Sequence, residues 1–206
     1  MEKKGLLVSL EGIDGSGKSL LAQNIFKKLT EQNIPVVLTK QPGGTNLGLK
    51  LRQILHEEKD NVCDLAEYFL FAADRAQHIK DIIIPALNSG KIIISDRMAD
   101  SSLAYQGYGR NLNIENIKSV NNWAMQNIEP DLILYIKIDI KTAQDRIFKR
   151  NESLTSFEKE KTEFWEKVIV GYEKIFKDRK NVITLDGTLS PEKLTTLAIT
   201  EIINKL

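Results

Sequence analysis

The sequence predicts an α/β fold in which a five-stranded parallel sheet carries helices on both faces. Short apolar runs with the length of strands alternate with segments of helical periodicity along all 206 residues, without internal repeats. Each of the five runs is separated from the next by a helical segment, which favours parallel pairing with helices on both faces. Polar residues follow directly after several runs, where an open parallel sheet binds its ligands. A chain of this length fits one domain, 1–206, better than two.

The first half of the chain is expected to supply three of the strands. The apolar run 5–10 predicts a buried strand, and 19–32 predicts a helix because Leu21, Ile25 and Leu29 fall on one face. Further strands are expected at 35–39 and 91–95, and further helices at 47–56 and 64–88.

The second half continues the alternation. Strands are expected at 131–138 and 182–185, and helices at 101–106, 114–127, 141–149, 162–176 and 191–206. Pro191 suits the first position of the last helix, because proline lacks the N–H that a first helical residue does not use.

Two segments need a closer look. In 64–88, Asp64 and Glu67 resemble a helix-capping pair, and Pro85 either kinks the helix or marks its end. The segment of about 150–161 is polar and charged and has no glycine. It is either a solvated connection or a flap over bound phosphates.

A phosphate-binding loop follows the first strand and opens the first helix. Gly12, Gly17, Lys18 and Ser19 fit the pattern G-x-x-x-x-G-K-[ST] in the strand-loop-helix context that it requires. Its backbone N–H groups and the positive end of the helix attract a polyphosphate together. Lys18 would reach the outer phosphates, and the Ser19 hydroxyl would be a ligand of Mg²⁺.

Other polar residues are placed by the same strand-end rule. Asp14, Lys40, Asp96 and Arg97 each follow a predicted strand. Asp96 is placed to hold Mg²⁺, usually through water, and Arg97 offers a planar fork for phosphoryl oxygens. The alternative for this Asp-Arg pair is a surface ion pair.

Two pairs at helical spacing predict a second ligand pocket. Phe71 and Arg75 share one helix face, where an aromatic ring and a guanidinium can stack on a base and bond its edge. Ser102 and Gln106 repeat the spacing and present a hydroxyl and an amide. The alternative for the first pair is a core phenylalanine and a surface arginine. Lys40 and Arg52 would add charge near a second phosphate.

Four longer motifs accompany the phosphate loop. They are Thr39-Lys40-Gln41-Pro42-Gly43-Gly44-Thr45, Phe71-Ala72-Ala73-Asp74-Arg75, Asp96-Arg97 and Ser101-Ser102-Leu103-Ala104-Tyr105-Gln106-Gly107-Tyr108-Gly109-Arg110. In this order they resemble the signatures of bacterial thymidylate kinases. The resemblance implies a single P-loop kinase domain that transfers the γ-phosphoryl group of ATP to dTMP with Mg²⁺. It also implies a homodimer.

The resemblance implies a role for each matching residue. ATP would be held by Gly12, Ile13, Asp14, Gly15, Ser16, Gly17, Lys18 and Ser19. Asp14 would also lie near the acceptor sugar and phosphate, Phe71 would stack on thymine, and Tyr105 would crowd the 2′ position of the sugar. The remaining dTMP contacts are expected from Lys40, Arg52, Arg75, Arg97, Ser102 and Gln106. Catalysis would rest on Lys18, Arg97 and Asp14, which align two phosphates and neutralise charge between them.

The sequence departs from the family pattern at three places. Lys40 and Gln41 replace an arginine and an acid before Pro-Gly-Gly, so we expect the usual salt bridge to become a looser contact. Met98 replaces the aromatic residue after Asp-Arg and keeps only apolar bulk.

The third departure is the flap. Family members with a small loop residue, as at Ser16, supply a catalytic arginine from an Asp-Arg-x-Glu-like flap sequence. The aligned residues here are Thr155-Ser156-Phe157-Glu158, which contain no arginine. Either another cation near the flap replaces it, or the enzyme is slow. We expect Arg146 and Arg150, on the helix that leads into the flap, to replace it.

Bulk composition excludes several other classes of function. A net charge of +1 argues against a nucleic-acid partner, and no apolar run approaches the roughly 20 residues of a membrane span. The single Cys63 cannot form an intrachain disulfide and is expected to be a small buried residue. His56 and His78 are too few and too separated for a metal cluster. The default location is the cytoplasm.

Three alternatives to a dTMP kinase remain. One is a small kinase for another nucleotide or nucleoside, against which the base-pocket residues argue. Another is a nucleotide-dependent switch, but a GTPase would need Asn-Lys-x-Asp, and the only Asn-Lys pair stands at Asn204-Lys205. The third is a non-catalytic relative, suggested by the missing flap arginine.

Overall fold

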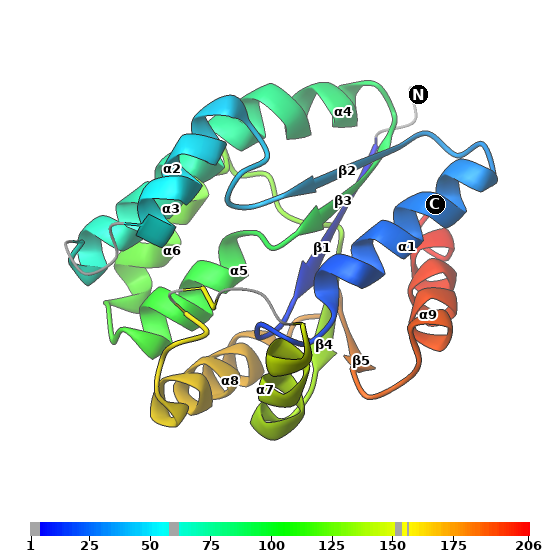
Figure 1. Ribbon diagram of the computed structural model, residues 1–206. Helices are drawn as coiled ribbons and strands as arrows, with labels where there is room; N and C mark the ends of the chain where they lie inside the picture. The colour runs from blue at the N-terminus through cyan, green and yellow to red at the C-terminus, as the bar shows by residue number, and fades with distance from the viewer. Residues whose placement is uncertain (1–4, 58–61, 151–153, 156) are drawn as a thin grey trace.

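The computed structural model describes residues 5–57, 62–150, 154–155 and 157–206. Its sheet has five parallel strands in the order β2-β3-β1-β4-β5 (Figure 1), which confirms the predicted architecture. The strands are β1 (Leu6–Glu11), β2 (Val36–Lys40), β3 (Ile92–Asp96), β4 (Leu132–Lys137) and β5 (Val182–Asp186). Every residue of β1 is buried, because this strand pairs with β3 on one side and β4 on the other.

Helices connect the strands close to the predicted positions. The α-helices are α1 (Lys18–Glu31), α2 (Asn46–Glu57), α3 (Asp64–His78), α4 (Ile84–Asn88), α5 (Ala99–Ser102), α6 (Ile114–Ala124), α7 (Ile140–Lys149), α8 (Thr162–Phe176) and α9 (Pro191–Ile203). Two π-helical segments, η2 (Ile79–Ile83) and η3 (Leu103–Gly109), extend α3 and α5. No helix among the described residues is long and apolar enough to cross a membrane.

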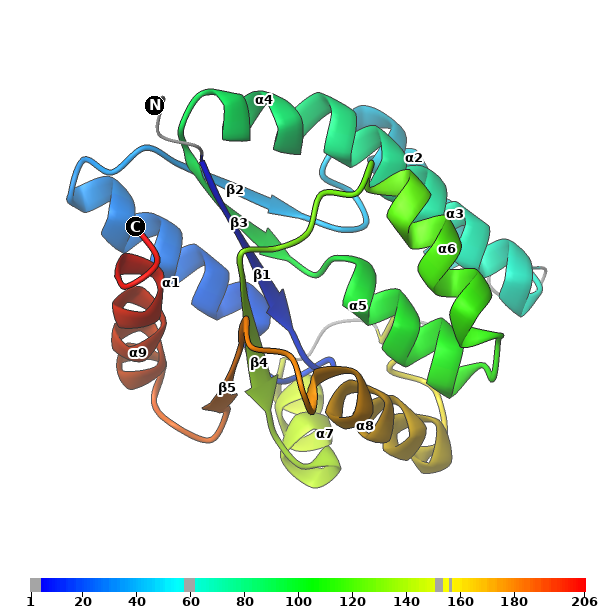
Figure 2. The same cartoon turned by 180° about the vertical axis from the view of Figure 1, so that it is seen from behind.

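The two faces of the sheet are covered by different helices (Figures 1 and 2). Successive strand residues point to opposite faces. Val8 therefore packs in one cluster with Ile25 of α1 and Ala198 of α9, while Leu7 packs with Ile79 of η2 on the other side. The second face is completed by α7 and α8, whose buried side chains pack against β4. Apolar residues on both faces leave the carboxyl ends of the strands as the natural place for a polar site.

The long helix predicted over 64–88 contains a local change of geometry. The π-helical segment η2 stands directly before α4, and Pro85 lies in the first turn of α4. Proline has no N–H and its ring crowds the carbonyl four residues earlier, here Asp81 inside η2. The wider π turn accommodates this, so the chain continues past Pro85 to Asn88.

Two predictions at the start of α3 are wrong. Cys63 occupies the N-cap position without a side-chain cap, and Asp64 and Glu67 lie in the first turn instead of forming a capping pair. Cys63 is also exposed rather than buried. The Glu67 side chain turns inward to Gln106, a partner that lies far along the chain.

Candidate functional site

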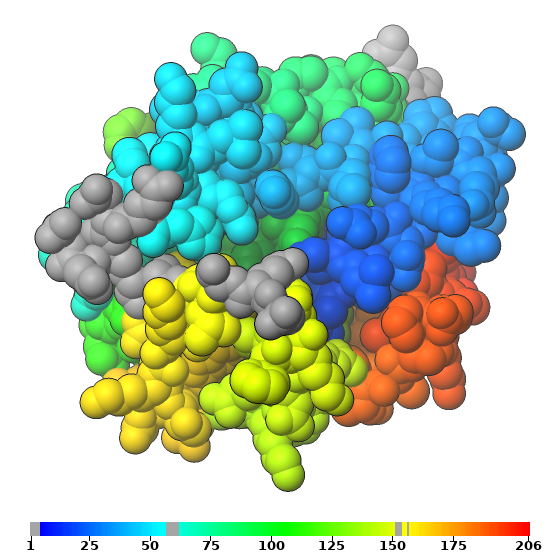
Figure 3. Space-filling model, in the orientation of Figure 1, coloured from blue at the N-terminus to red at the C-terminus, as the bar shows by residue number. Residues whose placement is uncertain are grey.

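A cavity of about 900 Å³ opens at the carboxyl ends of the strands. It lies between the phosphate loop, the segment after β2, helices α2, α3 and α7, and η3, and Figure 3 shows this face of the molecule hollowed between α1 and α2. The predicted site residues that line it are Asp14, Gly15, Gly17, Lys18, Ser19, Lys40, Arg52, Phe71, Arg75, Asp96, Arg97, Ser102, Tyr105, Gln106, Arg146 and Arg150. One cavity thus brings together the phosphate loop and the second pocket.

Three predicted loop residues do not line the cavity. The side chains of Ile13 and Ser16 are buried, and the backbone of Gly12 faces β4. A Cβ at Gly12 would lie 2.5 Å from the Ile136 carbonyl oxygen, and its φ of 143° is one that side chains rarely adopt. Gly12 and Ile13 can therefore contact a phosphate only through the loop backbone, whereas the Ser16 hydroxyl accepts a hydrogen bond from the Lys18 ammonium at 3.4 Å.

Lys18 is folded back onto the phosphate loop. Its ammonium donates to the Ile13 carbonyl at 2.7 Å. Burial, with a smaller effect of the Arg97 charge, lowers the pKa of Lys18 to about 8. An anion beside this ammonium would favour the protonated form. The geometry therefore suits a lysine whose ammonium pairs with a phosphate when the nucleotide binds.

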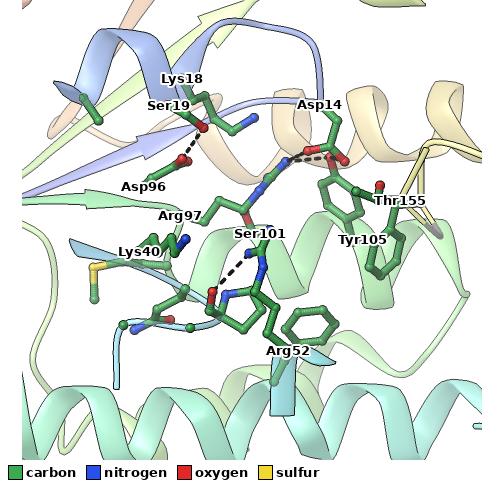
Figure 4. A pocket seen from close by; sticks show the side chains of 18 of the residues that line it. Asp14, Lys18, Ser19, Lys40, Arg52, Asp96, Arg97, Ser101, Tyr105 and Thr155 are labelled. Atoms are coloured by element: carbon green, nitrogen blue, oxygen red, sulfur yellow. Dashed lines mark hydrogen bonds and ion pairs between the residues drawn. The ribbon is translucent and has the colours of Figure 1, made fainter. Parts of the chain in front are cut away.

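Ser19 and Asp96 meet across the loop. The Ser19 hydroxyl donates to Asp96 Oδ2 at 2.5 Å (Figure 4), because the parallel register sets Asp96 beside Leu10, just before the loop. No group of three or more His, Cys, Asp or Glu side chains in the described part of the chain could hold a metal ion. A hydroxyl and a carboxylate oxygen suit Mg²⁺, which is usually bound by one or two protein ligands with water and phosphates. The two residues fit the predicted metal site.

Arg97 is the most connected side chain of the site. Its Nη2 donates to Asp14 at 2.5 Å and to the Tyr105 hydroxyl at 3.0 Å (Figure 4). Its Nη1 donates to the Gly12 carbonyl at 2.9 Å. Burial alone would raise the pKa of Asp14, but the charges of Arg97 and Lys18 outweigh it and lower that pKa. The backbone of Arg97 has a φ of 72°, which is rare outside glycine and typical of functional sites.

Three residues behind Arg97 were not predicted. The Glu11 carboxylate is fully buried and accepts hydrogen bonds from Ser101 Oγ at 2.6 Å and the Tyr172 hydroxyl at 3.1 Å. Both hydroxyls also contact Arg97 Nη1. Ser101 begins the motif that ends at Arg110, and Glu11 directly precedes the phosphate loop, but their contacts with Tyr172 depend on tertiary packing.

The segment after β2 is held by a buried histidine. Gln41 is buried and its amide lies 2.7 Å from His78 Nδ1, while His78 Nε2 lies 2.5 Å from Thr39 Oγ1. Burial and the nearby Arg75 lower the pKa of His78 to about 4, so this imidazole is neutral at physiological pH. Gln41 therefore makes a buried contact with a neutral imidazole, while its neighbour Lys40 is exposed and lines the cavity.

The second pocket is built from α3 and η3. Arg75 is only 2% exposed, so the alternative of a surface arginine is wrong. Its Nη1 donates to Asn121 Oδ1 at 2.9 Å and its Nη2 to Ser102 Oγ at 3.0 Å. Asn121, from α6, was not predicted because nothing in its own segment marks it. The ring of Phe71 also lines the cavity.

The described part of the predicted flap reaches this pocket. Thr155, Phe157 and Glu158 line the cavity, while 151–153 and Ser156 lie outside the described residues. The centre of the Phe157 ring lies 6.0 Å from the centre of the Phe71 ring. It lies 5.4 Å from the centre of the Tyr105 ring, and these two rings meet edge to face. This placement favours a flap over a purely solvated connection.

The two arginines expected to replace the flap arginine occupy different places. Arg146 bridges the phosphate loop and the segment after β5, donating to the Ser16 carbonyl at 3.3 Å and the Gly187 carbonyl at 2.8 Å. Arg150 Nη2 donates to both carboxylate oxygens of Glu158, at 2.9 and 3.0 Å. Both line the cavity, one on the loop side and one on the flap side.

Comparison with known proteins gives one consistent result. A sequence model of the family described as thymidylate kinase matches residues 10–197, which include every residue that lines the cavity. A thymidylate kinase of Halothermothrix orenii is 38% identical over 193 residues, 93% of this chain and 93% of the relative. Thymidylate kinases of Fervidobacterium nodosum and Finegoldia magna are both 41% identical, over 189 and 191 residues that cover at least 91% of each chain.

Proposed function

The chain belongs to the thymidylate kinase family and has that family's function, and we propose how its residues divide the reaction between two ligands. The reaction transfers the γ-phosphoryl group of ATP to dTMP and yields ADP and dTDP. The observation that carries the assignment of residues is the single cavity that joins the phosphate loop to the Phe71 and Arg75 pocket. A donor on the loop and an acceptor in the pocket would face each other across Arg97 and Asp14.

On the donor side, the backbone from Gly12 to Ser19 would bind the ATP phosphates. Lys18 would leave the Ile13 carbonyl and hold the outer phosphates. Ser19 and Asp96 would hold Mg²⁺. When bound, the ion would neutralise phosphate charge as the phosphoryl group moves.

On the acceptor side, the base would lie against Phe71 with its edge toward Arg75, Ser102 and Gln106. Lys40 and Arg52 would add positive charge around the dTMP phosphate, and Tyr105 would lie against the sugar. Arg97 would hold the acceptor phosphate while Asp14 and the hydroxyls behind it fix the guanidinium.

The protein supplies alignment and charge in this mechanism. An oxygen of the dTMP phosphate forms a bond to the γ-phosphorus while the bond from that phosphorus to the bridging oxygen of ADP breaks. Holding both phosphates in line lowers the entropic barrier, and fixed cations stabilise the negative charge that spreads over the transferred group.

A substrate panel tests this proposal. We expect ATP-dependent ADP release with dTMP, little release with CMP or AMP, and none without Mg²⁺, measured in a coupled assay that also includes dUMP. An equal rate without any acceptor would instead indicate a nucleotide-hydrolysing switch. Absence of dTDP with every acceptor would indicate a non-catalytic protein.

We also propose a homodimer. On α3, Leu65 and Phe69 are one helical turn apart and each is 51% exposed, although both are large and apolar. Exposed apolar neighbours of this kind mark protein interfaces. Sedimentation of the pure protein should give twice the 23.3 kDa of one chain, and the double change Leu65→Asp and Phe69→Asp should give monomers. A wild-type monomer at micromolar concentration would contradict the proposal.

The cytoplasm is the location that we propose for this activity. Cys63, the one cysteine, is exposed and unpaired, which fits a reducing compartment. Fractionation of source cells tests this, and recovery outside the cytoplasmic fraction would contradict it.

A further inference from the structure

Glu67 is a buried acid in the wall of the second pocket, behind Gln106. It lies in the first turn of α3 and is only 4% exposed. Its Oε1 accepts a hydrogen bond from Gln106 Nε2 at 2.9 Å, and its Oε2 accepts one from Arg110 Nη2 at 3.3 Å. The position of Glu67 is therefore fixed from two sides.

This contact determines which end of the Gln106 amide faces the cavity. An ionised carboxylate only accepts hydrogen bonds, so the amide nitrogen must point to Glu67. The amide oxygen then points away from Glu67, on a side chain that lines the cavity. The cavity is thus lined by an acceptor at Gln106 and by the guanidinium donor group of Arg75.

We propose that Glu67 is a positioning residue that sets the base specificity of the kinase by fixing the orientation of Gln106. This inference rests on the proposed function, in which Gln106 faces the base. Thymine presents an N3–H donor next to the O4 acceptor, and these match an amide oxygen and a guanidinium. Cytosine presents the reverse, an acceptor at N3 and an amino donor at C4. Its N3 would face the amide oxygen, which is also an acceptor, and its amino group would face the guanidinium, which is also a donor. Buried hydrogen-bonding groups that must stay unpaired reject a ligand strongly.

Arg110 prevents Glu67 from moving. Its Nη2 also pairs with Glu160 at 2.8 Å, and its guanidinium lies over the Phe164 ring, 4.6 Å from the ring centre. Glu160 belongs to the predicted flap, and Arg110 also lies over the ring of Phe157. Arg110 therefore connects Glu67, the partner of Gln106, to the predicted flap.

The isosteric change Glu67→Gln tests the orientation. Arg110 would donate a hydrogen bond to the amide oxygen of the new glutamine, so the amide nitrogen of that glutamine would face Gln106. Gln106 would then turn its oxygen to residue 67 and its nitrogen to the cavity. We expect dTMP affinity to fall about tenfold, as for one lost hydrogen bond, and the ratio of dTMP to dCMP affinity to fall by more than that. Calorimetric titration of each nucleotide measures both.

A matched control and a double variant separate this role from a structural one. Glu160→Gln also removes a carboxylate that pairs with Arg110, but in the described part of the chain this carboxylate makes no hydrogen bond with Gln106. This change should leave the ratio of dTMP to dCMP affinity within about twofold of wild type. In a Gln106→Leu background, Glu67→Gln should change the ratio no further, because its effect passes through Gln106.

Three outcomes would overturn the inference. They are an unchanged ratio in Glu67→Gln, an equal loss of affinity for both nucleotides, and a Glu67→Gln effect that persists with Gln106→Leu. Thermal unfolding of each variant shows whether an equal loss comes from misfolding. A wild-type protein that binds no dTMP would overturn the proposed function itself, which distinguishes the two failures.

Discussion

Replacing Arg97 with alanine is expected to lower kcat for dTMP phosphorylation by about 10³-fold, since a cation that stabilises the transferring phosphoryl group is worth roughly that factor. In the structure this guanidinium makes contacts with Asp14, Tyr105, Ser101 and the phosphate loop. Its loss would remove the positive charge between donor and acceptor and release Asp14 from its ion pair. Steady-state rates at saturating ATP and dTMP measure the effect.

Arg97→Lys is the matched control for charge. Lysine keeps the positive charge but cannot reproduce the planar fork that reaches Asp14 and the Gly12 carbonyl at once. We expect it to recover only a small part of the lost rate. Wild-type turnover in Arg97→Ala, with the variant folded by circular dichroism, would contradict the assigned role.

The second large effect is expected from the two arginines near the missing flap arginine. At least one of Arg146→Ala and Arg150→Ala should lower kcat tenfold or more, and an arginine finger can supply about 10³-fold. Arg146 is anchored on the phosphate loop, whereas Arg150 is tied to Glu158 in the flap. A loss confined to Arg150→Ala would place the catalytic cation on the flap side, and a loss confined to Arg146→Ala would place it on the loop.

Lys149→Ala provides the control for this pair. Lys149 is exposed on the same helix, carries the same charge and does not line the cavity. Its removal should leave kcat within about twofold of wild type, because exposed charges outside the site are screened by solvent. If neither arginine variant loses tenfold in kcat, the idea that these residues replace the flap arginine is wrong.

The fold could be predicted because its signals are local. Apolar runs and helical periodicity mark the strands and helices, and the strand-end rule places Asp14, Asp96 and Arg97 at one edge of the sheet. The phosphate loop carries its own pattern between β1 and α1. These features depend on neighbours in the sequence, so a single chain reveals them.

The parts that could not be predicted depend on partners far apart in the sequence. Glu67 is expected at a helix cap because it stands three residues after Asp64, the spacing of a capping pair, yet its partner Gln106 is supplied by η3. Nothing local shows that Asn121 bonds Arg75 or that Tyr172 reaches Glu11. Cys63 was misplaced because average burial of cysteine says little about a residue at a helix start.

The strand order also has a consequence for how the protein is made. β1 and β3 are neighbours in the sheet, but β2 and α1 through α4 separate them in the sequence. Such non-local pairing requires a long loop to close, which makes it slow to form. A growing chain that ends before Ile92 already contains the whole phosphate loop, but it lacks β3, which ends at Asp96, and the Arg97 that follows it. The phosphate loop therefore has no catalytic partner until nearly half of the protein has been synthesised and β3 has paired with β1.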